Sequence, residues 1–450
     1  MRTCRAVLVF LSVVLLPLGI DVHAQTAKAR YEILKLIRKE KFDLILPGAM
    51  RDNDFDIWIH VIRDGIPDPL ALDLGGTAGY FVFTDRGGDR IERAVFGGRG
   101  SAMMERDVYD VYGREEDLRP YVEERNPEKI AVNTSAWIPA SDGLSHSGYQ
   151  KLMEMLGRKY GSRLTSAENL IIDFRVRRVQ REIIAFANAA EKHRQIVETA
   201  LSNAVIIPGV TTREDVAWWV QDRLLEQGLG SSFGLSRPSV IYSSVSDPSQ
   251  TRSLDYIFQR GDFLSFDMGV KYLNFGTDYK RNAYILRAGE TSVPASIQHA
   301  FQQNLKAREI MRRNIMVGRT AGETLAACAA ALEKEGFIYT PFVNTQPEDR
   351  NIINSLGTSE KSGISIDCHM VGNTGNSQTA VGAAFAPFRQ SKAHLYIQPN
   401  HLFSFEYIVH TAIPERPQNR LAINFEDNHI VTERGVEWLY PPNEKIIIIK

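Results

Sequence analysis

Two aspartates, Asp267 and Asp278, lie in segments that predict neighbouring β-strands. Residues 263–270 are mostly apolar or β-branched and hold Asp267 as their only acid, and a second strand is predicted around Asp278. If these strands form a hairpin that turns at Tyr272 and Leu273, the aspartates lie directly opposite each other, with Cβ atoms about 4.5–5.5 Å apart. Carboxylates at that spacing require a cation between them or a shared proton. A longer turn would instead leave two ordinary acids at strand ends.

Three further polar residues interrupt apolar segments in the last third of the chain. His369 and Glu426 belong to strand-like stretches, and Glu406 is the only acid in residues 402–409, where burying it without a partner is costly. Together with the aspartates they supply four carboxylates and one imidazole. Such a set suits two divalent ions, either Mn, Co, Zn or Fe, and four negative charges would balance two such ions. Taken singly, each residue has an ordinary explanation as a surface acid, a strand-end acid or a core histidine.

Together and in this order, these residues resemble the ligands of the pita-bread metallopeptidases, the family of methionine aminopeptidase, prolidase, aminopeptidase P and creatinase. The motif Gly-Asp-x4-Asp-x-Gly ends at Gly269 and contains Asp267, and the second aspartate is followed by Arg281. His369 precedes an x-x-Gly, and an isolated glutamate and a Glu-Asp pair follow. The resemblance implies that Asp267 chelates one metal, that His369 and Glu406 chelate the other, and that Asp278 and Glu426 bridge them.

The resemblance also implies a fold and a reaction. The expected fold is an α/β N-terminal creatinase-like domain at 25–173, followed by an α+β pita-bread catalytic domain at 174–450. The expected reaction is hydrolysis of Xaa-Pro bonds, of the aminopeptidase P or prolidase type, with a metal-bridging hydroxide as nucleophile and Glu406 as general base. Relatives of this kind imply a homodimer.

Several positions depart from the family pattern. No histidine lies between His193 and His299, and Asn376 stands where a second histidine is usual. Tyr407 replaces the proline after the strand glutamate, and Asn424 replaces an arginine two residues before the final glutamate. The metal ligands are therefore present, but the side chains that handle substrate and protons are not.

One residue is a candidate replacement for the missing histidines. His410 shares a face with Glu406 if both belong to one strand, so it is a candidate catalytic residue, with ordinary packing as the alternative. Two other functions stay open. One is a pita-bread enzyme that acts on a non-peptide small molecule, as a creatinase-like C–N hydrolase or a lyase. The other is a binding protein without catalysis.

The start of the chain predicts export. Arg2 and Arg5 precede the apolar run 6–20, and Val22-His23-Ala24 predicts cleavage after residue 24, so residues 1–24 read as a signal peptide. An uncleaved anchor is the alternative. The expected location is periplasmic or extracellular, without a membrane partner after cleavage. A net charge of −1 gives no electrostatic reason to expect nucleic acid. The mature chain keeps two cysteines, Cys328 and Cys368, too few for a disulfide framework.

The elements that position these residues can be predicted from periodicity and turn signals. A boundary is predicted near Phe174, followed by a helix whose basic run from Arg175 to Arg181 reads as a solvated face. Thr211 or Thr212 is predicted to cap a later helix, and a long loop is predicted at 344–363. Helices are predicted at 27–41, 115–124, 149–160, 175–201, 215–227, 294–315 and 322–335, and strands at 43–47, 56–62, 80–83 and 130–132.

Overall fold

The structure is a computed structural model that describes residues 27–243, 250–340, 348–357, 359–373, 381–416 and 419–450. The predicted signal peptide and Asn376 lie outside the described residues. Among the described residues, no helix has both the length and the hydropathy that crossing a bilayer would need.

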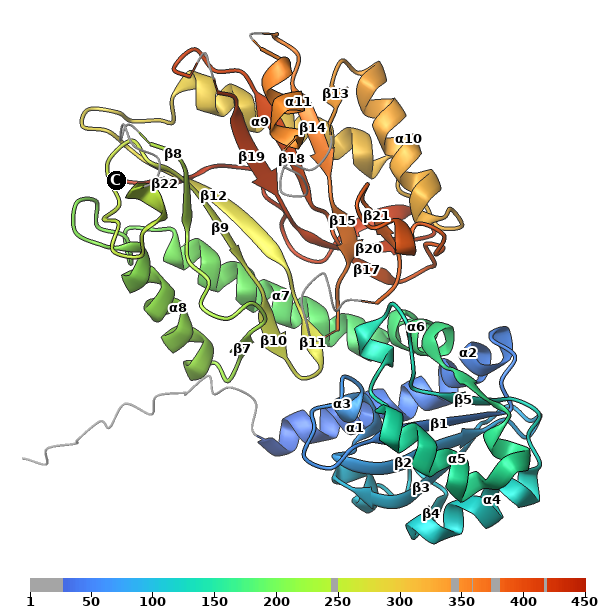
Figure 1. The fold of residues 1–450 in the computed structure, drawn as a ribbon. Coiled ribbons are helices and arrows are strands. Elements are labelled where there is room, and N and C mark those ends of the chain that lie inside the picture. Colours follow the sequence, from blue (N-terminus) through green and yellow to red (C-terminus); the bar gives the residue numbers. More distant parts are fainter. Residues whose placement is uncertain (1–26, 244–249, 341–347, 358, 374–380, 417–418) are drawn as a thin grey trace, which may run out of the picture.

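The first part of the chain forms a six-stranded mixed sheet with helices on both faces (Figure 1). Trp58 and Ile62 of its central strand belong to one buried cluster, whereas Ile57, Ile59 and Val61 belong to a second cluster. This alternation gives the sheet a core on each face. The strands, in spatial order, are β4 (Val111–Gly113), β3 (Glu92–Arg99), β2 (Ala78–Thr84), β1 (Ile57–Ile62), β5 (Ile130–Val132) and β6 (Leu164–Ser166), and the helices are α1 (Ala27–Leu44), α2 (Leu46–Asp52), α3 (Ala71–Leu74), α4 (Leu118–Arg125) and α5 (His146–Gly161).

Most elements predicted in this part are confirmed, but the strand predicted at 43–47 is wrong. Those residues end α1 and begin α2. Pro47 stands in the first turn of α2, where its missing N–H has no intrahelical partner to lose. An apolar run of this length therefore forms a buried helix start instead of a strand.

Two helices lead from the first sheet into the second part of the chain. The single helix predicted from Arg175 is divided into α6 (Glu168–Val176) and α7 (Gln180–Ala200). The prediction of a solvated basic face is wrong for Arg175 and Arg178, which are buried, whereas Arg181 is exposed. Arg178 donates to Glu182 at 3.1 Å and to the side-chain oxygen of Asn373 at 2.8 Å, so it joins α7 to the segment after the candidate ligand His369. The predicted boundary near Phe174 falls within α6 and stays a prediction.

In the described residues of the second part of the chain, four sheets are covered by α7 and by the helices α8 (Arg213–Glu226), α9 (Ala295–Arg312) and α10 (Ala321–Lys334). Thr212 caps α8 as predicted, since its hydroxyl accepts from the N–H of Asp215. The loop predicted at 344–363 contains the short helix α11 (Asp349–Ser355). The sheets, in spatial order, are β11 (Phe275–Gly276), β10 (Val270–Tyr272) and β7 (Gly230–Ser231); β22 (Ile447–Ile449), β12 (Tyr279–Ile285), β9 (Phe263–Met268) and β8 (Ser239–Tyr242); β13 (Ile338–Tyr339), β14 (Gly363–Ile366), β18 (Tyr407–Thr411) and β19 (Leu421–Phe425); and β16 (Ala384–Phe385), β15 (Cys368–Met370), β17 (His401–Ser404), β20 (Asn428–Thr432) and β21 (Gly435–Trp438).

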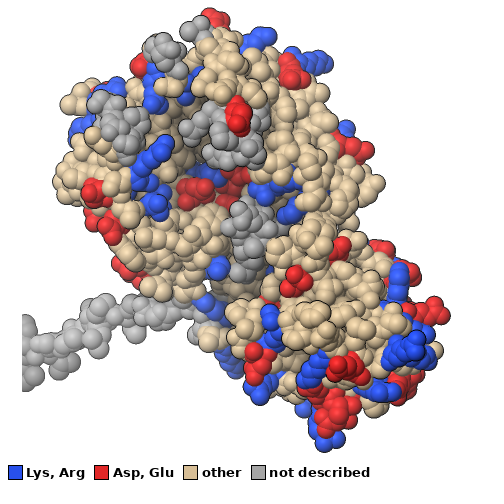
Figure 2. Space-filling model, in the orientation of Figure 1, with Lys and Arg blue, Asp and Glu red and all other residues tan. Residues whose placement is uncertain are grey.

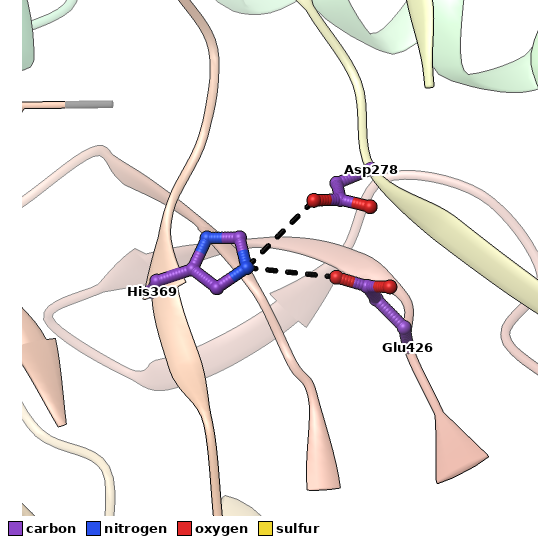
Figure 3. Close-up of side chains that lie close together, drawn as sticks. All are labelled: Asp278, His369 and Glu426. Atoms are coloured by element: carbon purple, nitrogen blue, oxygen red, sulfur yellow. Dashed lines mark ion pairs between the residues drawn. The ribbon is translucent and has the colours of Figure 1, made fainter. Parts of the chain in front are cut away.

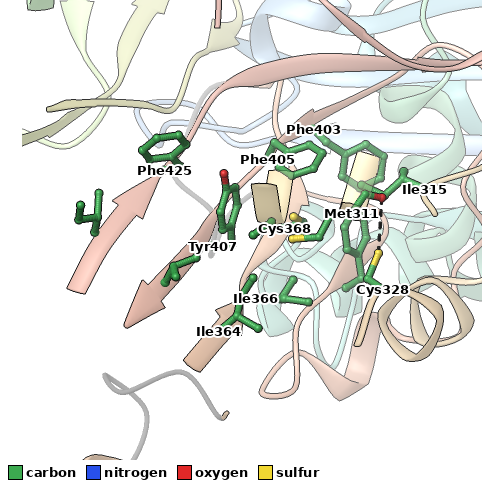
Figure 4. Packing of buried hydrophobic residues seen from close by; sticks show 14 of the residues in the cluster. Met311, Ile315, Cys328, Ile364, Ile366, Cys368, Phe403, Phe405, Tyr407 and Phe425 are labelled. Carbon is green, nitrogen blue, oxygen red and sulfur yellow. Dashed lines mark hydrogen bonds between the residues drawn. The ribbon is translucent and has the colours of Figure 1, made fainter. Parts of the chain in front are cut away.

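Two hydrophobic clusters hold the helices against these sheets. One lies between α9, α10 and strands β14, β15, β17, β18 and β19 (Figure 4). Cys368 is buried in this cluster, which confirms the prediction that it is a core residue. The other cluster lies between α7, α8 and strands β9 and β12. The strand faces turned away from the helices carry polar residues, among them Asp267 and Lys280 of the paired strands β9 and β12.

The predicted pairing of Asp267 with Asp278 is wrong, because the hairpin turn lies one residue later than predicted. Strand β10 pairs Tyr272 with Phe275, so the turn lies at Leu273 and Asn274, and Leu273 adopts a φ of 55°. The same register continues into β9 and β12, where Asp267 faces Lys280. A one-residue shift of the turn therefore places a cation directly opposite Asp267, and Asp278 lies diagonally on the same face.

Candidate metal centre

The predicted ligands are held where strands end and the chain passes from one sheet to another. Asp267 lies one residue before the end of β9, Asp278 directly precedes β12, and His369 follows the break between β14 and β15. Glu406 separates β17 from β18, and Glu426 follows β19. The single strand predicted at 402–409 is therefore two strands in different sheets, and the break at Glu406 turns its carboxylate to the junction.

Three carboxylates surround the imidazole of His369. Its Nε2 lies 3.7 Å from Asp278 Oδ2, 3.6 Å from Glu406 Oε2 and 3.6 Å from Glu426 Oε1. Figure 3 shows His369, Asp278 and Glu426 converging from separate elements. Ligand atoms about 2.0–2.2 Å from one ion lie roughly 3–4 Å from one another. Asp278, His369 and Glu426 have ligand atoms within 4.8 Å of one another and could hold one divalent ion, and Asp367, His369 and Glu406 form a second such group.

The other nitrogen of His369 is oriented by the backbone. Its Nδ1 lies 3.2 Å from the carbonyl oxygen of Met370. That contact keeps the proton on Nδ1, so Nε2 faces the three carboxylates and offers its lone pair to an ion once its own proton is displaced. The imidazole is thus oriented as a metal ligand.

The opposite side of the cluster contains a cation that the sequence prediction missed. Lys280 Nζ lies 3.2 Å from Asp267 Oδ2 and 2.8 Å from Glu406 Oε1, and it donates to Glu426 Oε2. Its side chain is only 8% exposed. Period-two alternation along β12 could have found it, because Lys280 follows Asp278 by two residues and therefore shares its face.

Two glutamates link the histidine side of the cluster to the lysine side. Glu406 directs Oε2 to His369 and Oε1 to Lys280, and Glu426 directs Oε1 to His369 and Oε2 to Lys280. The resemblance implied a bridging role for Glu426, and the side chain has the orientation for that role. It bridges the imidazole of His369 and the ammonium of Lys280.

Polar neighbours fix the orientation of both glutamates. Asn424 Nδ2 donates to Glu406 Oε1 at 3.0 Å, and Ser404 Oγ donates to Glu426 Oε1 at 2.5 Å. Asn424 stands where the family pattern has an arginine, so here an uncharged amide and Lys280 share the oxygen Oε1 of Glu406. Arg281 has no part in this cluster, since its Nη1 donates to Asp427 Oδ1 at 2.7 Å.

The pKa values of the two aspartates are both raised. Burial is the main cause for each, and the nearby carboxylates of Glu406 and Glu426 raise the pKa further, while Lys280 opposes the rise. Asp278 is buried, but 48% of the Asp267 side chain is exposed, so solvent limits the rise at Asp267. Without an ion, Asp278 is therefore the carboxyl that keeps its proton most readily.

His369 and Glu406 are shifted towards their charged forms. Burial alone would lower the pKa of His369, but hydrogen bonding to Glu406 and Glu426 raises it to about 9. Burial would likewise raise the pKa of Glu406, but Lys280 and His369 hold it well below its usual range. The metal-free histidine is then protonated at neutral pH, so an ion must displace that proton in order to bind.

His410 lies on β18, four residues after Glu406 along the chain, and is buried. Its Nε2 lies 3.5 Å from Ser365 Oγ, and burial lowers its pKa to about 4. A role for His410 in proton transfer stays a prediction.

The cluster opens to solvent on the side of Asp267. Figure 2 shows a hollow in the second part of the chain with acidic side chains at its base and basic side chains beside it. The exposure of Asp267 agrees with such an opening. A small polar substrate could therefore reach the carboxylates without unfolding any strand.

The sequence of the chain also matches a known protein family. The family model of metallopeptidase family M24 matches residues 185–433, which is more than half of the chain. The chain belongs to metallopeptidase family M24. This family is metal-dependent, and the acidic and histidine groups gathered here could bind a metal. No curated protein sequence matches the chain.

Solved structures confirm the expected two-part fold. An X-Pro aminopeptidase from Thermotoga maritima is 16% identical with a TM-score of 0.62, and the match covers 89% of this chain and 99% of that one. An Xaa-Pro dipeptidase from Bacillus anthracis is 17% identical with a TM-score of 0.60, covering 92% and 99%. A prolidase from Pyrococcus horikoshii is 14% identical with a TM-score of 0.56, covering 91% and 99%. At these identities the likeness establishes the fold of this M24 member.

Proposed function

We propose that this M24 member is an exported metal-dependent exopeptidase that hydrolyses Xaa-Pro bonds, as an aminopeptidase P or a prolidase does. The observation that carries the proposal is the convergence of His369 with Asp278 and Glu426, whose ligand atoms lie within 4.8 Å of one another, a spacing that a divalent ion could occupy. The preference for proline rests on the solved structures named as X-Pro aminopeptidase, Xaa-Pro dipeptidase and prolidase. Export rests on the signal pattern of residues 1–24.

Different residues of the site would have different roles in hydrolysis. Asp278, His369 and Glu426 would hold an ion of the Mn, Co, Zn or Fe type. When bound, such an ion lowers the pKa of water and polarises a carbonyl. Glu406 Oε2 is the oxygen positioned to accept a proton, since its other oxygen is engaged by Lys280 and Asn424.

The number of ions is a separate matter from the reaction. The sequence predicts two ions, with Asp267 as a ligand of the second. A second ion beside Asp267 would need the ammonium of Lys280 to leave its three carboxylates. The homodimer implied by the family is also a proposal, and light scattering on the mature chain tests it.

The experiment is hydrolysis of a short Xaa-Pro peptide by the chain from residue 25, before and after chelation and after return of Mn, Co or Zn. An Xaa-Ala peptide of the same length is the matched substrate control, and Glu406→Gln is the control for the protein. We expect cleavage that chelator abolishes, metal restores and Glu406→Gln lacks. Metal binding without cleavage of any Xaa-Pro peptide would refute the peptidase proposal.

One observation favours a second candidate function, hydrolysis or elimination at a C–N bond of a small molecule. Lys280 brings a positive charge into the site, and the histidines typical of the peptidases are missing. Both features alter the contacts that a peptide would meet while keeping a polar cavity. A panel of small amidines and related compounds, tested beside the Xaa-Pro peptides, distinguishes the two functions.

A further inference from the structure

The side chain of Lys280 occupies a position that a metal ion would need. Its Nζ lies among Asp267 Oδ2, Glu406 Oε1 and Glu426 Oε2, which come from β9 and from the chain breaks beside β18 and β19. An ammonium has three N–H donors. Glu406 and Glu426 accept hydrogen bonds from Lys280, and Asp267 forms an ion pair with it at 3.2 Å. An ion placed between the same oxygens would overlap the nitrogen, so the ammonium and an ion exclude each other.

The backbone fixes this position. Lys280 stands directly opposite Asp267 in the antiparallel ladder of β9 and β12. Opposed residues of a ladder face the same side of the sheet and lie close together, and opposite charges there attract. The register on both sides, from Phe263 with Tyr284 to Met268 with Tyr279, keeps the lysine over the cluster.

The charges also favour one ion. The cluster has four carboxylates, Asp267, Asp278, Glu406 and Glu426, and Lys280 contributes one positive charge. One divalent ion beside Lys280 brings the positive charge to three, close to balance. Two divalent ions beside it would bring the positive charge to five, in excess of the carboxylates. Repulsion between an ammonium and a second ion in this buried site would be strong.

We propose that Lys280 is a built-in substitute for one of two metal ions, so that the site takes a single divalent ion on the side of His369. The ion would be held by His369, Asp278 and Glu426 Oε1. Asp267 is then a partner of Lys280 instead of a metal ligand. This inference refines the metal site of the proposed function and rests on it for the identity of the ion.

The test is metal stoichiometry, measured without any peptide. The metal-free mature chain is titrated with Co²⁺ and Mn²⁺ by calorimetry, and bound metal is counted by elemental analysis after dialysis. We expect one ion in the wild type and two in Lys280→Ser, which removes the ammonium and opens its space. Lys271→Ser is the matched control, because Lys271 lies exposed in the same hairpin, and it should bind one ion.

Three further variants assign the ligands. In Lys280→Ser combined with Asp267→Asn, the second ion should be lost again, because Asp267 would be its ligand. In Asp267→Asn alone, one ion should still bind, whereas His369→Ala should weaken that ion about 100-fold or more. If Lys280→Ser does not fold, the wild-type count and Asp267→Asn decide the matter without it.

The outcomes separate this inference from the peptidase proposal. Two ions in the wild type would overturn the inference and leave the peptidase proposal intact. Loss of the single ion in Asp267→Asn would also overturn the inference. If the wild type bound no ion, both the inference and the metal-dependent function would be overturned. One ion in the wild type without cleavage of Xaa-Pro peptides would support the inference and refute the peptidase.

Discussion

Replacing Lys280 with methionine removes the ammonium from the carboxylate cluster and keeps a side chain of similar volume. In the metal-free protein, Asp267, Glu406 and Glu426 would then face one another without the cation that now binds all three. We expect a large loss of stability, because the remaining carboxylates stay buried with their charges uncompensated.

The size of the loss follows from the burial of the partners. Removing one partner of a buried ion pair costs about 3–5 kcal/mol. Glu426 and Glu406 are buried, but half of Asp267 is exposed, so the lower end of about 3 kcal/mol applies. For the second part of the chain, a loss of about 3 kcal/mol corresponds to a fall in melting temperature of about 6–12 °C.

The loss should depend on pH in a defined direction. Without the ammonium, the clustered carboxyls bind protons more tightly in the folded state than in the unfolded state. The free energy of unfolding of the variant therefore decreases as the pH rises, by about 1.4 kcal/mol per pH unit for each extra proton held. The difference between wild type and Lys280→Met should be larger at pH 8 than at pH 6.

Differential scanning calorimetry in the presence of a chelator, at both pH values, measures this effect. Lys271→Met is the matched control, since it removes an exposed lysine from the same hairpin and should change the melting temperature little. A shift in melting temperature of less than about 1 °C is negligible. A shift that small in Lys280→Met would refute the assignment of Lys280 as the cation of the cluster. Equal losses in both lysine variants would refute it too.

Three other variants test separate parts of the structure. Burial holds the pKa of His429 at about 3, against 6.5 in the unfolded state, so the free energy of unfolding decreases as the pH falls below 6.5. In His429→Phe this decrease should be smaller by about 1.4 kcal/mol per pH unit between pH 6 and 4, as measured by denaturant unfolding. Gly269→Ala would bring its Cβ into a clash with the carbonyl oxygen of Thr277, and we expect a loss of about 1–3 kcal/mol in the same assay, with an unchanged midpoint as the contrary result. If His410 transfers protons, His410→Ala should lower turnover of an Xaa-Pro peptide about 100-fold and alter its pH profile; unchanged kinetics would exclude that role.

The gathering of these side chains at one site could be predicted in part from the sequence, because isolated acids in apolar segments are informative. Glu406 and Asp267 each stand alone among apolar neighbours, and burial of such acids needs a compensating group. The structure brings both to one junction with His369 and Glu426. Capped helices were predictable for a similar reason, since the hydroxyl of Thr212 at the start of α8 is a local signal that needs no tertiary context.

Buried charge and strand breaks were not predictable in the same way. Arg175 and Arg178 look like a solvated helix face, yet both are buried by contacts with residues distant in sequence, such as Asn373. The segment around Glu406 reads as one strand because its apolar pattern is continuous. Its division between β17 and β18 depends on which partners each half finds in two different sheets.

The error in the hairpin register had the largest consequence for function. Counting from a turn at Tyr272 and Leu273 places Asp278 opposite Asp267 and suggests two repelling carboxylates that an ion must neutralise. Counting from the turn at Leu273 and Asn274 places Lys280 there, and the protein supplies the neutralising charge itself. Five ligands in family order are therefore not sufficient to specify two ions, because a neighbouring residue on the same strand face decides how much positive charge the cluster still needs.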